Sequence, residues 1–442
     1  MKDKSCLKEF LQYTALNVLG MLGLSCYILA DTFFVSKGLG ADGLTALNLA
    51  IPIYSFVHGS GLMLGVGGSA KYAILRGQQS SKDANLIFTN TLYLTLIMAA
   101  LFVLIGLFGS EKITWFLGAD SSVFGMTNTY LKVILLFAPA FMLNDVFLCF
   151  VRNDGNPRLA MMAMLAGSFS NILLDYIFIF PCNMGILGAV CATGFAPVIS
   201  MAVLTGHLKK KDHFARVKCR VQYDLAGKIV ALGIPSLITE VASGIVMIVF
   251  NFLILDIQGN VGVAAYGVVA NLALVVVAIH TGVAQGMQPL ISRAFGVKDF
   301  KSIRKFLKYA MWTMTVISVL IYAGLFIWAE PIASVFNSEG NLQLQSMAVI
   351  GLKLYFTAVW FIGFNVVLAM YFIATENPVP AQVISVLRGI VLVIPVAFVM
   401  AYMWEITGVW LTMVVTEGIV CLIGIIILIR RTCNIDVRSL IR

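Results

Sequence analysis

The chain is dominated by long apolar runs that recur along its whole length. A helix needs about 20 mostly apolar residues to cross the hydrocarbon core of a bilayer. Runs of this length or longer predict twelve membrane-spanning helices, at about 11–36, 44–75, 86–109, 131–151, 159–181, 186–208, 229–255, 263–291, 306–329, 347–373, 381–403 and 406–429. The alternating ten-residue patterns of membrane β-barrels are absent. We therefore predict an all-α polytopic membrane protein.

The composition agrees with this fold class. Of the 442 residues, 60% are hydrophobic and 12% are charged, whereas a soluble domain has about 25% charged residues. This balance excludes a soluble enzyme and a disordered regulator, and several cysteines lie inside the apolar runs, unlike those of a secreted disulfide scaffold. No phosphate-binding loop, zinc motif or nucleophile motif is present. We therefore expect no enzymatic activity and no cofactor, and an ion gradient as the energy source.

The basic residues predict the orientation of the chain in the membrane. The net charge of +9 is spread over the loops between the apolar runs, so we expect no nucleic-acid partner. Lys and Arg concentrate in the loops that lie on the same side of the membrane as the N-terminus, and the positive-inside rule assigns this side to the cytoplasm. Both termini are therefore predicted to be cytoplasmic. The longest polar break, Lys209–Lys228, is interpreted as a cytoplasmic basic linker.

The two sides of this linker repeat each other. At a spacing of about 220 residues, Gly61 matches Gly282, and Asn156-Pro157 matches Asn377-Pro378. Two copies of six spans share one orientation, which predicts a pseudo-two-fold axis along the membrane normal and a cleft between the copies. This architecture is typical of alternating-access secondary transporters. The predicted units are an N-terminal lobe (1–208, spans 1–6), the linker (209–228) and a C-terminal lobe (229–442, spans 7–12 and the tail).

Four polar residues of the first lobe are predicted to share one layer of the membrane. Asp31 and Asp175 each lie six residues from the outer end of a span, about 9 Å below the boundary. Thr193 lies at a similar depth, and Asn171 is one helical turn from Asp175. A carboxylate near the bilayer centre costs about 2.5–3.5 kcal/mol, and two close carboxylates either share a proton or bind a hard cation such as Na⁺. We predict a cation-coupling site; the alternative is simple bonding between helices.

Other intramembrane polar residues are open to more than one interpretation. Glu240 and Glu417 lie near mid-span in helices seven and twelve, where they attract a cationic substrate, form a second proton site or bond neighbouring helices. Asp145 is seven residues from Arg152, and we expect these two to pair. His58 is expected to be a helix-packing residue.

Several of these segments belong to recognisable motifs. They are ADTFFVSKGLGADGLTALNLAIP around Asp31, RNDGNP after span four, SNILLDYIFIF around Asp175, GILGAVCAT ending at Thr193, GIPSL opening span seven and GMQPLISRAFG at Gly286–Gly296. The chain resembles the multidrug and toxic compound extrusion (MATE) transporters over essentially its whole length. The last motif, with Gln288-Pro289, is similar to the bacterial DNA-damage-inducible branch of these transporters.

The resemblance implies two six-helix lobes arranged as a V, which export cationic amphipathic compounds in exchange for H⁺ or Na⁺. It implies a cation site, with no other metal, formed by Asp31, Asn171, Asp175 and Thr193. Candidates for a substrate-binding or second proton-binding role are Glu240, Glu417 and Gln288. We expect a monomer in the bacterial inner membrane, with the lipid bilayer and cationic small molecules as its partners.

Two other functions are compatible with a two-lobe membrane protein. A lipid-linked oligosaccharide flippase of a related superfamily would line its cleft with basic residues, for which Arg388 is the one candidate. A non-transporting membrane scaffold would need neither the duplication nor the carboxylate layer.

Overall fold

The computed structural model describes residues 3–210, 213–337 and 340–440, and within these ranges every regular element is a helix. The first part of the chain forms α1 (Asp3–Gly77), α2 (Ser81–Phe108), α3 (Ser110–Phe116), α4 (Phe124–Leu136), α5 (Ala138–Asn153), α6 (Pro157–Ile179), α7 (Gly185–Leu204) and the 3₁₀ turn η1 (Thr205–Lys209). The second part forms α8 (Tyr223–Gly296), α9 (Phe300–Ile327), α10 (Ala329–Phe336), α11 (Leu342–Tyr355), the 3₁₀ turn η2 (Phe356–Ala358), α12 (Val359–Ala374), α13 (Pro378–Val386), the π turn η3 (Leu387–Val391) and α14 (Val393–Leu440). The predicted lobes and linker also include residues 1–2, 211–212 and 441–442, which lie outside the described residues.

The prediction of twelve spans is confirmed in the described part of the chain. Eight helices there are long and apolar enough to cross a membrane, and α4 with α5, bent by 48° at their junction, makes a ninth span. Three of the eight, namely α1, α8 and the stretch Pro378–Arg431 from α13 through η3 to α14, each contain two spans joined at a kink. The kinks lie at Gly40, Gly259 and Glu405, whose φ angles are 68°, 64° and 48°. Glycine adopts this left-handed conformation without strain, which suits the two equivalent positions Gly40 and Gly259.

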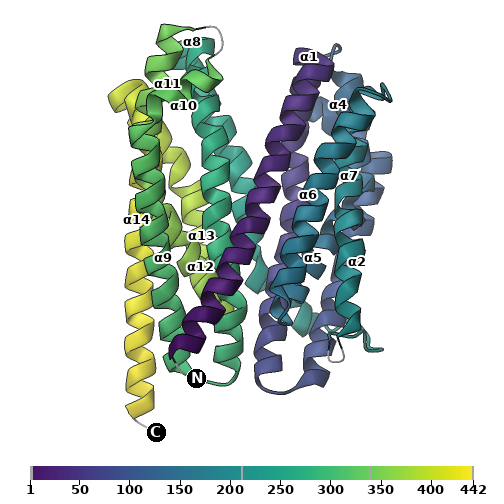
Figure 1. Ribbon diagram of the computed structural model, residues 1–442, viewed down its shortest axis with the longest axis vertical. Helices are drawn as coiled ribbons and strands as arrows, with labels where there is room; N and C mark the ends of the chain where they lie inside the picture. Colours follow the sequence, from purple (N-terminus) through teal and green to yellow (C-terminus); the bar gives the residue numbers. More distant parts are fainter. Residues whose placement is uncertain (1–2, 211–212, 338–339, 441–442) are drawn as a thin grey trace.

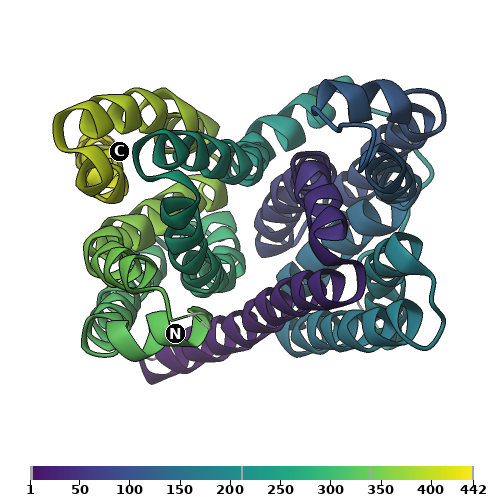
Figure 2. The ribbon, with the colours of Figure 1, turned by 90° about the horizontal axis from the view of Figure 1, so that it is seen from above.

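The spans form two groups, the N-lobe (α1–α7) and the C-lobe (α8–α14). Figure 1 shows the groups standing apart at the top, while both chain ends lie at the bottom. Near the bottom the lobes are joined, because the first span of each lobe packs on the second span of the other. A Cβ added to Gly286 of α8 would lie 2.8 Å from the Thr14 Cα of α1, and one added to Gly67 of α1 would lie 2.1 Å from the Ile229 carbonyl oxygen of α8. Figure 2 shows the start of α1 running from one group to the other.

The apolar cores follow the same arrangement. One cluster joins Phe10 at the start of α1 with Met287 of α8 and Phe306 of α9. Another joins the second span of α1 with α2, α5 and Ile229 at the start of α8. The contact between the lobes near the chain ends is therefore part of the two cores.

Candidate functional site

The carboxyl groups of Asp31 and Asp175 meet inside the N-lobe. Asp31 lies on the first span of α1 and Asp175 on α6, and their side chains hydrogen-bond to each other. Asp31 is 7% exposed and Asp175 is fully buried. The Oδ1 atom of each residue is buried without a hydrogen-bond partner. Two buried carboxyl groups this close either share a proton or bind a hard cation.

Asn171 and Thr193 lie beside this pair, where the sequence predicts them. With its amide nitrogen toward the carboxyl group, Asn171 donates to Asp175 Oδ2 at 3.1 Å and accepts from the Thr193 backbone N–H at 3.3 Å. The Thr193 hydroxyl donates to the Ala189 carbonyl oxygen at 3.1 Å. The Tyr130 side chain, from α4, forms a hydrogen bond with Thr193 and was not predicted.

The arrangement brings together oxygen atoms from helices α1, α6 and α7. Carboxylate, carboxamide and hydroxyl oxygens are the ligands that hard cations such as Na⁺ prefer, and the two carboxyl groups also accept protons. Among the described residues there is no group of three or more His, Cys, Asp or Glu side chains placed to hold a metal ion. The geometry thus fits a site for a proton or a monovalent cation, and its role in coupling stays a prediction.

Asp145 does not pair with Arg152, so that expectation was wrong. The Asp145 carboxylate lies 2.9 Å from His58 Nδ1, because the second span of α1 presents His58 toward α5. The His58 ring stacks on Tyr54 with a centroid distance of 5.8 Å. The Tyr54 hydroxyl in turn lies 3.1 Å from that of Tyr27, one helical turn from Asp31.

Arg152 instead joins the two lobes. Its Nη1 donates to Asn17 Oδ1 of α1 at 2.8 Å and to Gln285 Oε1 of α8 at 2.7 Å. Gln288, a candidate substrate or proton residue, lies in the same seam: its side-chain oxygen accepts from Asn153 at 2.9 Å. The structure therefore places Gln288 at the contact between the lobes.

Glu240 belongs to the C-lobe by sequence but packs against the N-lobe. A Cβ added to Gly59 of α1 would lie 3.0 Å from the Glu240 Cβ atom, because the first span of α8 crosses to α1 here. Glu240 is half-buried, and its carboxyl group lies within electrostatic range of His58 and Asp145. Although Glu240 lies in the C-lobe part of the sequence, its side chain packs on the N-lobe, which also contains Asp31 and Asp175.

Glu417 is held by two partners inside the C-lobe. Arg388 donates to Glu417 Oε1 from Nε at 3.0 Å and from Nη2 at 2.7 Å. Asn365 donates to Glu417 Oε2 at 2.7 Å and to the Glu417 carbonyl oxygen at 2.9 Å. The structure does not bring Glu240, Glu417 and Gln288 together, and the guanidinium of Arg388 is already paired.

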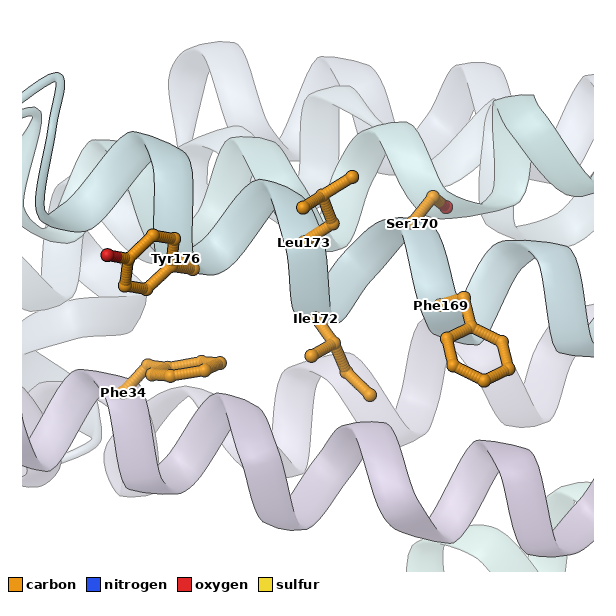
Figure 3. A pocket seen from close by; sticks show the side chains of 6 residues that line it. All are labelled: Phe34, Phe169, Ser170, Ile172, Leu173 and Tyr176. Carbon is orange, nitrogen blue, oxygen red and sulfur yellow. The ribbon is translucent and has the colours of Figure 1, made fainter.

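A groove of about 500 Å³ lies between α1 and α6, lined by Phe34, Phe169, Ser170, Ile172, Leu173 and Tyr176 (Figure 3). The rings of Phe34 and Tyr176 lie 6.2 Å apart, centroid to centroid. Phe169 and Leu173 are exposed, whereas Asn171 and Asp175 on the same helix are buried, so the groove lies on the opposite face of α6 from the carboxyl pair. Its apolar lining suits hydrocarbon chains and does not select for charge.

A family model described as MatE matches residues 18–177 and 235–399. The chain belongs to the MatE family. It is therefore a multi-pass membrane transporter and not an enzyme, as the motifs around Asp31 and Asp175 imply. The multidrug export protein MepA of Staphylococcus saprophyticus is 26% identical over 445 aligned residues, which cover 100% of this chain and 98% of the relative. MepA of Staphylococcus aureus is 25% identical, with 98% of this chain and 96% of the relative covered.

Solved structures share the fold. One described as "Outward-facing conformation of a multidrug resistance MATE family transporter of the MOP superfamily" has a TM-score of 0.91, 22% identity and 99% coverage of both chains. A "MOP superfamily transporter from Pyrococcus furiosus" has a TM-score of 0.90, 22% identity, and coverage of 97% of this chain and 96% of that one. The predicted fold of two six-helix lobes in a MATE-type V is confirmed.

Proposed function

We propose that this MatE-family transporter is a secondary active multidrug efflux antiporter, which exports cationic amphipathic compounds in exchange for H⁺ or Na⁺. The observation that carries the proposal is the buried Asp31–Asp175 pair, in which each carboxyl group keeps one unpartnered oxygen. Such a pair supplies a negative charge that a cation neutralises reversibly, which ion coupling requires. The curated relatives named multidrug export proteins support the substrate class.

The proposed cycle uses the contact between α1 and α6. With the lobes apart at the end opposite the chain termini, H⁺ or Na⁺ binds at Asp31 and Asp175 with help from Asn171 and Thr193. Binding changes how the first span of α1 packs on α6, and the exported compound is released. After the lobes reorient, the ion leaves and a new compound enters from the cytoplasm or inner leaflet. Ion and compound then oppose each other through a coupling free energy of about 1–3 kcal/mol.

The candidate substrate or second proton residues take different parts in this proposal. Half-buried Glu240, at the contact between the lobes, suits the cationic group of the compound. Gln288, bonded to Asn153 across the lobes, suits a contact that must break when the lobes separate there. Glu417 is neutralised by Arg388, and its role is treated below.

We further propose a monomer in the bacterial inner membrane, with both termini in the cytoplasm and cationic amphipathic small molecules and lipid as its partners. Both chain ends lie at the same end of the molecule (Figure 1), and basic Arg293 pairs with Glu9 near the start of the chain. The proposed units are the N-terminal lobe at 1–208, the linker at 209–228 and the C-terminal lobe at 229–442. We propose no cofactor and no nucleic-acid partner.

The test is efflux of a fluorescent organic cation from proteoliposomes, with a pH gradient and a Na⁺ gradient imposed separately. We expect efflux under one gradient and its loss in Asp175→Asn, with Asp224→Asn, an exposed carboxylate paired with Lys228, as the matched control. No efflux under either gradient would contradict the drug assignment and direct the search to lipid-linked substrates. Efflux of wild-type rate in Asp175→Asn would contradict the site.

A further inference from the structure

The C-lobe contains a buried polar cluster, which we call the Arg388 cluster: Asn365 of α12, Arg388 of η3 and Glu417 of α14. Glu417 is 1% exposed and Asn365 is fully buried. Arg388 supplies two hydrogen bonds to one carboxylate oxygen and Asn365 one to the other. The cluster thus joins three helices of the lobe through a single carboxylate.

The donor and acceptor types match those of the N-lobe site. Glu417 and Asn365 provide a carboxylate and a carboxamide, as Asp175 and Asn171 do in the N-lobe. The difference lies in the charged partner, because Asp175 of the N-lobe meets the acid Asp31, whereas Glu417 of the C-lobe meets the guanidinium of Arg388.

The backbone fixes the guanidinium in place. Arg388 lies in the π turn Leu387–Val391, which adds a residue to the helical turn and redirects the side chains that follow. The next residue, Gly389, packs so closely on α8 that an added Cβ would lie 2.5 Å from the Ala242 Cβ. The turn therefore cannot move toward α8, and Arg388, with a side chain 13% exposed, stays on Glu417.

Further polar atoms near the cluster lack partners. The Asn365 Oδ1 atom and both ring nitrogens of fully buried His280 have no hydrogen bond. The His280 ring faces α12, since its Nε2 would lie 3.5 Å from a Cβ added to Gly363, two residues before Asn365. Asn365 therefore has one buried oxygen that Arg388 does not use and that a small cation could bind.

We propose that Arg388 is a tethered cation, which neutralises Glu417 in the C-lobe as an exchangeable cation neutralises the Asp31–Asp175 pair in the N-lobe. This rests on the proposed function of the Asp31–Asp175 pair. The C-lobe then stays in the arrangement of a cation-bound lobe throughout the cycle, and only the N-lobe exchanges its ion. It follows that removing the charge of Arg388 turns Glu417 and Asn365 into a second site for H⁺ or Na⁺.

The test uses the full chain with Asp31→Asn and Asp175→Asn, so that the N-lobe pair contributes no exchangeable cation. Into this background we introduce Arg388→Met, which keeps the length of the side chain and removes its charge. The measurement is the Tm in detergent as a function of Na⁺, at constant ionic strength, and of pH. A cation that binds only the folded chain raises Tm with its concentration.

We expect the Tm of the Arg388→Met chain to rise with Na⁺ or with falling pH relative to the background chain, whose own pH dependence comes from groups such as Asp154. Adding Glu417→Gln should abolish the response, because the carboxylate that binds the cation is gone. A folded Arg388→Met chain that responds to neither cation would overturn the proposal.

Arg388→Lys keeps the proposal testable if Arg388→Met does not fold. Its ammonium group still supplies a cation to Glu417, so we expect the Tm to depend on Na⁺ and pH no more than in the background chain. A response in Arg388→Lys would show that the charge at position 388 does not fill the site, and would also overturn the proposal. Failure of the proposed function is separate, because it appears as wild-type efflux in Asp31→Asn or Asp175→Asn.

Discussion

The polar cores of the two lobes use similar side chains but obtain their positive charge differently. In the N-lobe, Asp31 and Asp175 meet without a basic residue and leave two buried oxygens unpartnered. In the C-lobe, Glu417 is bonded through both oxygens to Arg388 and Asn365. Both lobes must neutralise a carboxylate in low dielectric. Under the proposed function, the N-lobe carboxylates are neutralised by a cation that can depart, whereas Glu417 of the C-lobe is neutralised by the Arg388 side chain.

The largest effect on stability is expected from breaking the fixed pair. Glu417→Ala should lower the free energy of unfolding by about 3–5 kcal/mol, because it leaves Arg388 buried and uncompensated. Asp175→Asn adds no buried charge to the N-lobe and should cost about 1 kcal/mol. Unfolding in mixed detergent micelles measures both. Equal losses of unfolding free energy in Glu417→Ala and Asp175→Asn would contradict the difference proposed between the two lobes.

The next effect concerns the seam that joins the lobes. Arg152→Met removes the hydrogen bonds to Asn17 and Gln285 and leaves both amides buried, at a cost of about 1–3 kcal/mol. Because these partners lie on α1 and α8, we expect the distance between the lobes near the chain ends to increase. Distances between spin labels on the two lobes test this. An unchanged distance distribution would mean that the apolar contacts alone join the lobes.

A smaller effect is expected from His58 and Asp145. Each single change, His58→Gln or Asp145→Asn, leaves a buried partner at the 2.9 Å contact unsatisfied. The double variant should therefore be more stable than the sum of the two losses predicts, by about 0.5–3 kcal/mol. Additive losses in a double-mutant cycle would argue against an energetic link between these side chains.

The smallest effects compare equivalent loops of the two lobes. The Asp154 carboxylate accepts from His207 and Tyr72, each at 2.8 Å, and its side chain is 2% exposed. Burial raises its pKa, but these hydrogen bonds and the charge of Lys210 lower it more, so the pKa lies below its usual value. In the C-lobe loop, Glu376 pairs with Lys71, and these side chains are 30% and 21% exposed.

Asp154→Asn should therefore lower stability at neutral pH by about 1–3 kcal/mol, and Glu376→Gln by about 0–1 kcal/mol. A lowered folded-state pKa stabilises the fold above the unfolded-state pKa of about 3.9, and this contribution is lost as the pH falls through the folded value. The difference between wild type and Asp154→Asn should thus shrink in acid. A difference that is constant with pH would contradict the assignment.

The sequence predicts much of this structure, for identifiable reasons. The lengths of the apolar runs predict the spans. The number of residues between each polar side chain and the end of its span predicts one layer of the membrane for Asp31, Asn171, Asp175 and Thr193. The pairs His58–Asp145 and Arg388–Glu417 could not be predicted this way, because they join residues 87 and 29 positions apart. Their contacts depend on how each helix is rotated and, for Arg388, on a π turn. The crossing of α8 onto α1, which takes Glu240 to the N-lobe, likewise depends on tertiary packing.

The central claim is that the exchangeable cation binds at the N-lobe pair. The direct measurement is cation binding to the purified chain at equilibrium, with radioactive Na⁺ for Na⁺ coupling and a pH-indicator dye for protons released when an organic cation is added. Wild type and the exposed-site control Asp224→Asn should exchange one cation per chain, and Asp31→Asn/Asp175→Asn none. Retention of that cation in the double variant would contradict the account.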